Sequence, residues 1–394
     1  MGRLGLQLTL VAVLFNLALA TPTPGSSFVT VPFVKKAHFS KTAAEILQKD
    51  LARLDNFAAR FGSLTKRAVG EVPATNEDDT YVVSTQVGSQ TFSLIVDTGS
   101  SNTWVGAGTK LVAGSTAVNS GKAFAVTYGS GSVSGTEFTD TVTVGGLTVT
   151  KQGVGDGTRS TGFEGVDGII GFGPVDLTED TVSGQTTVPT VLDNLLAQGV
   201  ITTEVLGVSF LPESGSDTDD TNGELTIGGT DSSKFTGSIT FVPKTTTSPY
   251  SEFWGISVTS LSFGSTTLSS AANAIVDTGT TLILIPQAAY NAFLKAAGGT
   301  TDSTTGLATF TKEPTSNFVF DIGGVSFTLT PTQFLIPKAQ YADFGLTGNN
   351  FFSWIANGGT DTADINFIIG QKFLENFYAE FDTTNSRVGF ATAI

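Results

Sequence analysis

The feature that most constrains this chain is a short phrase that occurs twice, 180 positions apart. An apolar run, SLIV, ends in Asp97 and is followed by TGSS, and a second run, NAIV, ends in Asp277 and is followed by TGTT. Each copy predicts an apolar strand that ends in a carboxylate and then a turn that contains glycine. The separation is about the length of one domain, so the chain is predicted to hold two similar lobes.

A second apolar phrase follows each copy. VDGIIG ends at Gly171, 74 residues after Asp97, and NFIIG ends at Gly370, 93 residues after Asp277. A buried strand closed by glycine is typical of a place where backbone approaches another group closely. The repeated unit therefore has two parts, and a pseudo-twofold axis between the lobes would bring the ends of the two Asp-bearing strands together.

Two carboxyl groups in contact have a defined chemistry. They cannot both ionise cheaply, so they share one proton and titrate as a pair. In known enzymes that use such a pair, one carboxyl group acts as a base on a trapped water while the other, protonated, donates to a substrate carbonyl. We therefore predict Asp97 and Asp277 as catalytic residues. The turn residues after each Asp offer N–H and hydroxyl groups to the carboxylates, and those predicted to support the pair are Thr98, Gly99, Ser100, Thr278, Gly279 and Thr280.

The residue types that the chain lacks exclude several other chemistries. It has no cysteine, which excludes disulfides, a thiol nucleophile and a thiolate metal site. Its only histidine is His38, in a segment that we expect to be removed. A Ser-His-Asp triad and a two-histidine zinc site are thereby excluded from the remaining chain. We expect no metal and no cofactor, and paired carboxylates at low pH remain as the acid–base chemistry.

The N-terminal region carries two processing signals. Arg3, an apolar run over residues 6–19 and the small residues at 18–20 predict a signal peptide over residues 1–20, and therefore secretion. The TAAE phrase at residues 42–45 has capping-box spacing, and apolar residues at helical intervals follow it up to a glycine at 62. Lys66 and Arg67 then form a dibasic pair that we interpret as a cleavage site at the end of a prosegment over residues 21–67.

The charge of the chain divides at the same place. Residues 21–67 carry a net charge of +5, whereas residues 68–394 carry −21. A basic segment tied to an acidic body should dock on it, and more weakly as acid protonates the carboxylates. This pattern indicates a zymogen, and we expect Lys35 or Lys36 to pair with the two Asp. The acidic body also disfavours nucleic acid or an anionic membrane as a partner, and we expect no membrane anchor.

With these motifs the chain resembles the pepsin family of aspartic proteases over essentially the whole predicted mature region. DTGSSNTW and VDTGTT are similar to the two signature loops of the family, and the YGSG phrase that begins at Tyr128 resembles the flap that closes over the bound peptide. The cysteine-free composition, rich in Ser and Thr, is most similar to basidiomycete fungal members of the family.

The resemblance implies an all-β, bilobal fold with a few short helices and pseudo-twofold symmetry. The N-terminal lobe would span residues 68–242 and the C-terminal lobe residues 243–394. It implies a monomeric aspartic endopeptidase, active at acid pH on polypeptides bound in extended form and inhibited by compounds of the pepstatin type. The residues that it places at the flap and the substrate pocket are Ile95, Trp104, Tyr128, Gly129, Ser130 and Ile169.

The sequence departs from the family pattern at one position near the predicted pair. The family usually has Asp after the second Ile-Leu-Gly-type phrase, and this chain has Gln371. That difference removes a charge near the pair but no predicted catalytic atom.

Two other functions remain open on the sequence alone. One is a catalytically inactive pepsin-like protein that binds another protein, although both Asp-Thr-Gly turns and Tyr128 are intact. The other is a secreted glycosidase, which would need its two carboxyl groups several ångströms apart. The position of the two carboxylates in the folded protein decides between a protease and a glycosidase.

Overall fold

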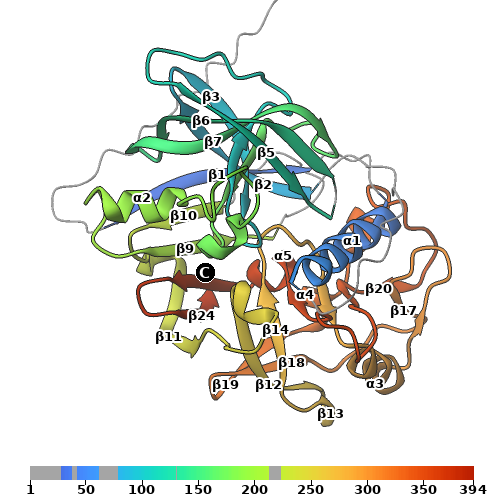
Figure 1. Cartoon of the computed structure of the whole chain (residues 1–394). Coiled ribbons are helices and arrows are strands. Elements are labelled where there is room, and N and C mark those ends of the chain that lie inside the picture. The colour runs from blue at the N-terminus through green and yellow to red at the C-terminus, as the bar shows by residue number, and fades with distance from the viewer. Residues whose placement is uncertain (1–27, 38–41, 62–78, 130, 213–222) are drawn as a thin grey trace, which may run out of the picture.

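The computed structural model describes most of the chain, namely residues 28–37, 42–61, 79–129, 131–212 and 223–394. The predicted signal peptide, the Lys66–Arg67 pair and Ser130 lie outside the described residues, and the predicted lobe boundary at residue 242 stays a prediction. The described chain is built mostly from strands with a few helices (Figure 1). None of the helices in these ranges is long and apolar enough to cross a membrane.

The largest sheet of the described chain has 13 strands and runs through the molecule. Its strands, in spatial order, are β11 (Phe235–Pro243), β24 (Arg387–Ala393), β23 (Phe377–Asp382), β9 (Val205–Phe210), β10 (Gly223–Ile227), β1 (Val29–Ala37), β2 (Asp79–Val87), β3 (Gln90–Asp97), β8 (Gly168–Gly171), β4 (Thr103–Val105), β7 (Leu147–Thr161), β6 (Ser132–Val144) and β5 (Val118–Thr127). Some of its strands, such as β9 with the sequence VLGVSF and β23, are buried along their whole length, which favours apolar and β-branched residues.

Two smaller sheets belong to the C-terminal half. The first contains, in order, β19 (Val325–Leu329), β18 (Phe318–Ile322), β12 (Gly255–Phe263), β14 (Ala272–Val276), β22 (Ile368–Ile369), β15 (Ile283–Ile285) and β21 (Ile355–Asn357), with β13 (Thr266–Ser269) paired to β12. The second contains β16 (Thr300–Thr301), β17 (Ala308–Phe310) and β20 (Phe351–Phe352). The α-helices are α1 (Ala43–Phe61), α2 (Val191–Ala197), α3 (Gln287–Ala297), α4 (Pro331–Phe334) and α5 (Gln371–Leu374). The 3-10 helices are η1 (Val175–Thr178), η2 (Ser232–Lys234), η3 (Tyr250–Glu252) and η4 (Lys338–Gln340).

The two halves repeat one arrangement of strands. In the first half β3 pairs parallel with β8, which pairs antiparallel with β4, and β4 pairs parallel with β7. In the second half β14 pairs parallel with β22, which pairs antiparallel with β15, and β15 pairs parallel with β21. This repetition confirms the predicted fold of two similar lobes, and it places an Asp-bearing strand end at the same point of each lobe.

Helix α1 forms where the sequence predicts it. Thr42 and Glu45 make the reciprocal capping bonds, with Glu45 Oε2 accepting from the Thr42 N–H at 2.7 Å and Thr42 Oγ1 accepting from the Glu45 N–H at 3.3 Å. One face of the helix is buried, including Ile46, Leu54 and Phe57. Figure 1 shows α1 beside the C-terminal lobe, below the strands of the N-terminal lobe. The helix therefore packs against the body of the protein through its apolar side.

The segment before α1 forms a strand that we did not predict. β1 lies between β10 and β2 and pairs antiparallel with both. Phe33 is buried in this strand, and its ring centroid lies 5.1 Å from that of Tyr81 and 5.2 Å from that of Phe210. The predicted prosegment is thus part of the central sheet of this structure.

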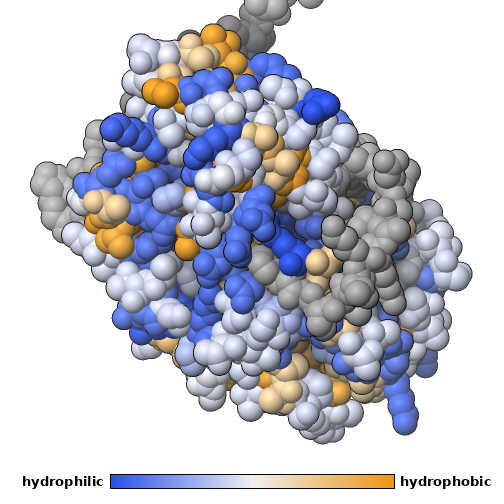
Figure 2. Space-filling model, viewed as in Figure 1, coloured by the Kyte–Doolittle hydropathy of each residue, from blue (hydrophilic) through white to orange (hydrophobic). Residues whose placement is uncertain are grey.

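The surface shows no continuous apolar strip on the face seen in Figure 2, where orange patches are scattered among hydrophilic and intermediate colours. The most exposed large apolar side chains of the described chain are Val112, at 70% exposure, Ile394, at 63%, and Val118, at 62%. Isolated apolar residues of this kind are ordinary on a protein surface.

Candidate active site

The two repeated turns meet at the centre of the molecule. Asp97 ends β3 and Asp277 follows β14, and both are fully buried. The Thr98 N–H donates to Thr278 Oγ1 at 2.9 Å, and the Thr278 N–H donates to Thr98 Oγ1 at 3.0 Å. These reciprocal bonds join the lobes at the residue after each Asp, which is the twofold relation that the repeated phrase predicts.

Each carboxylate is held by its own turn. Asp97 Oδ1 accepts from the Gly99 N–H at 2.9 Å and Oδ2 accepts from Ser100 Oγ at 2.5 Å. In the other turn, the Gly279 N–H and Thr280 Oγ1 donate to Asp277 at 2.9 and 2.6 Å. The donors are the same in kind and position in both turns, so the six turn residues named from sequence are brought together around the pair.

The glycines of the two turns allow the carboxylates to face each other. A Cβ on Gly99 would lie 2.6 Å from Oδ1 of Asp277, and a Cβ on Gly279 would lie 2.7 Å from Oδ1 of Asp97. No side chain fits at such distances, so glycine is required at both places. Each carboxylate thus contacts the turn of the other lobe, an arrangement that suits a pair sharing one proton rather than the separated carboxyls of a glycosidase.

A basic residue from α1 lies between the two carboxylates. Arg53 is 5% exposed, and its Nε donates to Asp277 Oδ2 at 2.6 Å. Its Nη2 donates to Asp277 Oδ1 at 3.0 Å and also to Asp97 Oδ1. Burial acts to lower the pKa of the Arg53 guanidinium, but the charges of Asp277 and Asp97 outweigh it and raise that pKa above its ordinary value. Arg53 is therefore charged, and it neutralises the pair.

The two carboxyl groups differ in their titration. Burial raises the pKa of Asp97 above its ordinary value, even though Arg53 acts against this, and the charge of Asp277 raises it further. Burial also acts to raise the pKa of Asp277, but the guanidinium of Arg53 outweighs it and lowers that pKa. The difference arises because Arg53 makes two hydrogen bonds to Asp277 and one to Asp97.

We expected this contact from Lys35 or Lys36, and in the structure Arg53 makes it. The backbones of Lys35 and Lys36 lie in β1, opposite Tyr81 and Thr80 of β2, and their side chains lie outside the described residues. A signal for Arg53 was present in the sequence, because a charged residue on the apolar face of a predicted amphipathic helix needs a buried partner. Without the fold, however, nothing identifies that partner.

A second charged residue on the same helix face was also missed. Asp50 is fully buried and accepts from the N–H groups of Leu282 at 2.7 Å and Thr281 at 3.3 Å. Burial raises the pKa of this carboxyl to about 6, although Lys49 and the two N–H donors act to lower it. Helix α1 therefore bonds both to the pair of Asp residues and to the chain that follows the second turn.

The tip of the β5–β6 hairpin covers α1. Tyr128 is buried, its N–H donates to the Gly131 carbonyl at 2.7 Å, and its hydroxyl accepts from Trp104 Nε1 at 2.9 Å. A Cβ on Gly129 would lie 2.0 Å from the Cα of Arg53, so this glycine allows the hairpin to rest directly on the helix. Asn56 of α1 donates to the Thr127 carbonyl at 2.8 Å.

The apolar residues predicted for the substrate pocket gather beside this tip. Ile95 and Ile169 are buried in one hydrophobic cluster with Trp104 and Tyr128. The aromatic ring of Phe163 completes the group, edge-on to both Trp104 and Tyr128. The structure thus brings together all the described members of the predicted flap and pocket set.

On its other side α1 fills a groove of the C-terminal half. Its apolar residues belong to one cluster with buried side chains that include Tyr250, Phe253, Leu307 and Ile336. The rings of Phe57 and Phe253 have centroids 4.5 Å apart. In this structure the space between the hairpin tip and the C-terminal half is therefore occupied by the protein's own helix.

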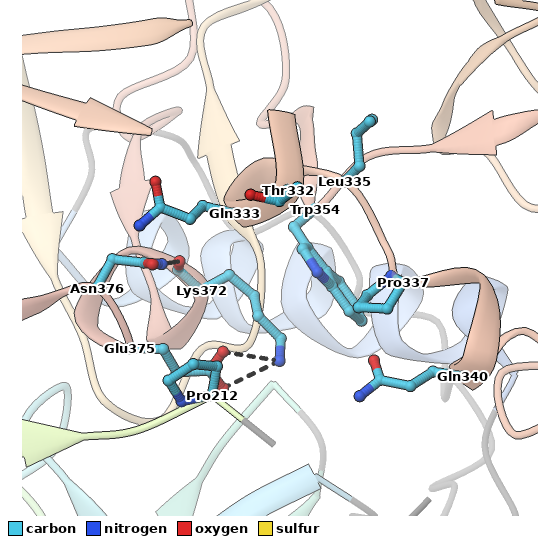
Figure 3. A pocket seen from close by; sticks show the side chains of 10 residues that line it. All are labelled: Pro212, Thr332, Gln333, Leu335, Pro337, Gln340, Trp354, Lys372, Glu375 and Asn376. Atoms are coloured by element: carbon cyan, nitrogen blue, oxygen red, sulfur yellow. Dashed lines mark hydrogen bonds and ion pairs between the residues drawn. The ribbon is translucent and has the colours of Figure 1, made fainter. Parts of the chain in front are cut away.

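A separate small cavity of about 80 Å³ lies beside α5. Figure 3 shows that Lys372 points from α5 toward Glu375 and Trp354. Lys372 Nζ bonds both carboxylate oxygens of Glu375, at 3.0 and 3.1 Å, and lies 4.4 Å from the centroid of the Trp354 ring. A space of this size holds a few water molecules and no peptide.

The chain matches proteins of known family. Residues 80–393 match the family model described as eukaryotic aspartyl protease. Polyporopepsin of Irpex lacteus is 49% identical over 333 residues, which cover 82% of this chain and 97% of that protein. Rhizopuspepsin-2 of Rhizopus niveus is 32% identical over 96% of this chain and 97% of that protein. The crystal structure of the aspartic proteinase from Irpex lacteus has a TM-score of 0.77 and 42% identity, and covers 93% of this chain and 97% of that chain.

Proposed function

Because this chain belongs to the family of eukaryotic aspartyl proteases and is a pepsin-like aspartic endopeptidase, we propose that Asp97 and Asp277 are its catalytic residues and that it is made as a secreted zymogen. The observation that carries this proposal is the position of Arg53, whose guanidinium bonds both carboxylates at once. This position supports a catalytic pair that is neutralised, until activation, by a segment that we expect to be removed.

In the mature enzyme the two carboxyl groups would share one proton and hold a water between them. The ionised group takes a proton from the water, whose oxygen bonds to the carbonyl carbon of the scissile peptide, while the protonated group donates its proton to the carbonyl oxygen. When the tetrahedral intermediate breaks down, its C–N bond breaks. The carboxyl group that holds the proton of the water passes it to the leaving nitrogen, and a hydroxyl of the intermediate returns a proton to the other, ionised group. The N–H groups of Gly99 and Gly279 and the hydroxyls of Ser100 and Thr280 keep the carboxylates in place throughout.

Latency of the precursor would follow from the position of α1. The hairpin tip at Gly129 rests on the backbone of Arg53, so a substrate chain has no room between the tip and the pair. Arg53 also lowers the pKa of Asp277. Because a lowered pKa stabilises the docked form above that value, docking weakens when acid protonates Asp277. This supports the assignment of residues 21–67 as a prosegment and acid as the signal for its release.

The substrate class proposed here is polypeptide in extended form. The buried apolar group of Ile95, Trp104, Tyr128 and Ile169 supports a preference for bulky apolar residues next to the scissile bond. Strand β5 lies at the edge of the large sheet, and the tip of its hairpin offers backbone groups for pairing with an extended chain. We further propose that the enzyme acts as a monomer, is inhibited by pepstatin-type compounds and is secreted by means of the N-terminal signal peptide.

The direct test is cleavage of a denatured protein after acid treatment of the purified precursor. The wild type should cut at mildly acid pH and be inhibited by pepstatin, and Asp97→Asn and Asp277→Asn should each lose activity while they keep the wild-type circular dichroism spectrum. Activity that survives pepstatin and both substitutions would refute the mechanism. A folded wild-type protein that never cuts would instead favour the inactive binding protein considered above.

A further inference from the structure

Gln371 makes two hydrogen bonds to the turn that follows Asp277. It is fully buried at the first position of α5, and its Nε2 donates to the Thr278 carbonyl at 2.9 Å. Its own N–H donates to the Thr280 carbonyl at 2.8 Å. These two carbonyls stand on either side of Gly279, so one residue holds both ends of the peptide segment that forms the turn.

The turn that Gln371 holds, residues 278–280, also positions the carboxylate of Asp277. The Gly279 N–H and the Thr280 hydroxyl donate to the two oxygens of Asp277. We propose that Gln371 is a positioning residue that keeps this turn in its working shape at every pH at which the enzyme acts. The proposal rests on the proposed function, and it extends that function by naming a residue that sets the pH range of the reaction without contact with the reacting atoms.

An amide is suited to this role because its N–H does not titrate. A carboxyl group can donate to the Thr278 carbonyl only while it is protonated. Oε1 of Gln371 has no donor among the described residues, so an ionised carboxylate in its place would be buried without a hydrogen bond. Burial of this kind raises the pKa of an acid toward the range in which an aspartic protease works.

The two cations near Gln371, Lys372 and Arg53, are already bonded to other carboxylates, so neither is available to stabilise such a carboxylate. On α5 itself, Lys372 is already bonded to both oxygens of Glu375, as Figure 3 shows. The strands β9, β15 and β22, which pack on α5, carry no titratable side chain. The other neighbouring elements carry titratable and charged groups, which are Asp277 in the turn, Asp50 and Arg53 on α1, Tyr81 on β2, and Tyr378, Glu380 and Asp382 on β23. The Tyr81 hydroxyl donates to Glu375.

The experiment compares kcat and KM across the acid range for the activated wild type and three variants of the full chain. Gln371→Glu keeps the length of the side chain but makes its donor titratable, and Gln371→Met keeps the approximate length without any donor. Gln340→Glu is the matched control, because it adds the same charge to a glutamine that lines the cavity beside Lys372.

We expect Gln371→Glu to lose kcat at lower pH than the wild type, with the upper limb of its profile moved down by about one pH unit as the new carboxyl ionises. Gln371→Met should lower kcat by about tenfold at all pH values, the effect of about one lost hydrogen bond, with little change in KM. Gln340→Glu should keep the wild-type profile.

The direction of the shift separates this role from a simple effect of charge. A negative charge that acted only through space would raise the pKa of the catalytic pair and move the upper limb to higher pH. An upward shift or no shift in Gln371→Glu, or a wild-type kcat in Gln371→Met, would overturn the proposal. If Gln371→Glu does not fold, Gln371→Met decides alone. A wild type that is inactive or insensitive to pepstatin would instead count against the proposed function itself.

Discussion

Replacing Arg53 with Ala should weaken the latency that we propose for the precursor at neutral pH. The side chain is 5% exposed and makes three hydrogen bonds to the two buried carboxylates, so its removal leaves the pair without a counter-charge. Breaking a buried ion pair by removing one partner costs about 3–5 kcal/mol. The pair can partly recover by sharing a proton, which favours the lower end of this range.

A loss of about 3 kcal/mol corresponds to a docking equilibrium that is roughly 150-fold weaker. The assay is hydrolysis of a fluorogenic peptide by the purified precursor at a series of pH values before any acid treatment. The precursor band is followed in parallel on gels. We expect Arg53→Ala to show activity at a higher pH than the wild type and to lose its prosegment sooner.

Two variants on the same helix provide controls. Arg53→Lys keeps the charge but cannot make the forked contact, so it should lie between the wild type and the Ala variant. Arg60→Ala removes a hydrogen bond of 2.7 Å from Arg60 Nη2 to the Glu179 carbonyl. This bond does not involve the two Asp residues, so its loss should weaken docking only slightly. The role given to Arg53 is wrong if Arg53→Ala stays as latent as the wild type, or if Arg60→Ala releases the enzyme as readily as Arg53→Ala does.

Three further outcomes follow from the contacts of the site. Burial raises the pKa of Asp50 to about 6 in the docked helix, so its ionised form weakens docking as the pH rises through that value. The gain in docking from Asp50→Asn should therefore be larger at neutral pH than at about pH 4, by up to about 3 kcal/mol. Equal pH dependence of latency in both proteins would contradict this. Trp104→Phe removes the donor to the Tyr128 hydroxyl and should lower kcat/KM by about fivefold. It should also lower Tm, because Trp104 is fully buried and the smaller ring leaves a cavity. An unchanged kcat/KM would deny this bond a role in the flap. Thr278→Val leaves the Thr98 N–H without its acceptor at the junction of the lobes and should lower the free energy of unfolding by about 2–3 kcal/mol in a denaturant titration; a midpoint equal to that of the wild type would show that the junction does not depend on this bond.

Local patterns made much of the fold and of the site predictable. The repeated Asp-Thr-Gly turn after an apolar strand indicated two similar lobes, and the structure repeats the strand pairing on which that expectation rests. The capping box at Thr42 and the helical spacing that follows it likewise predicted α1. These predictions succeeded because turn chemistry, capping and periodicity depend on residues close together in the chain.

The rest depended on contacts between distant residues. Three features join segments that are far apart in sequence. They are the pairing of β1 with both β10 and β2, the position of Arg53 between Asp97 and Asp277, and the hydrogen bond from Gln371 to Thr278. The sequence by itself determined which side chains could do the chemistry. Only the tertiary structure decided which basic residue neutralises them and what holds the second turn, because a buried charge or amide finds its partner through packing.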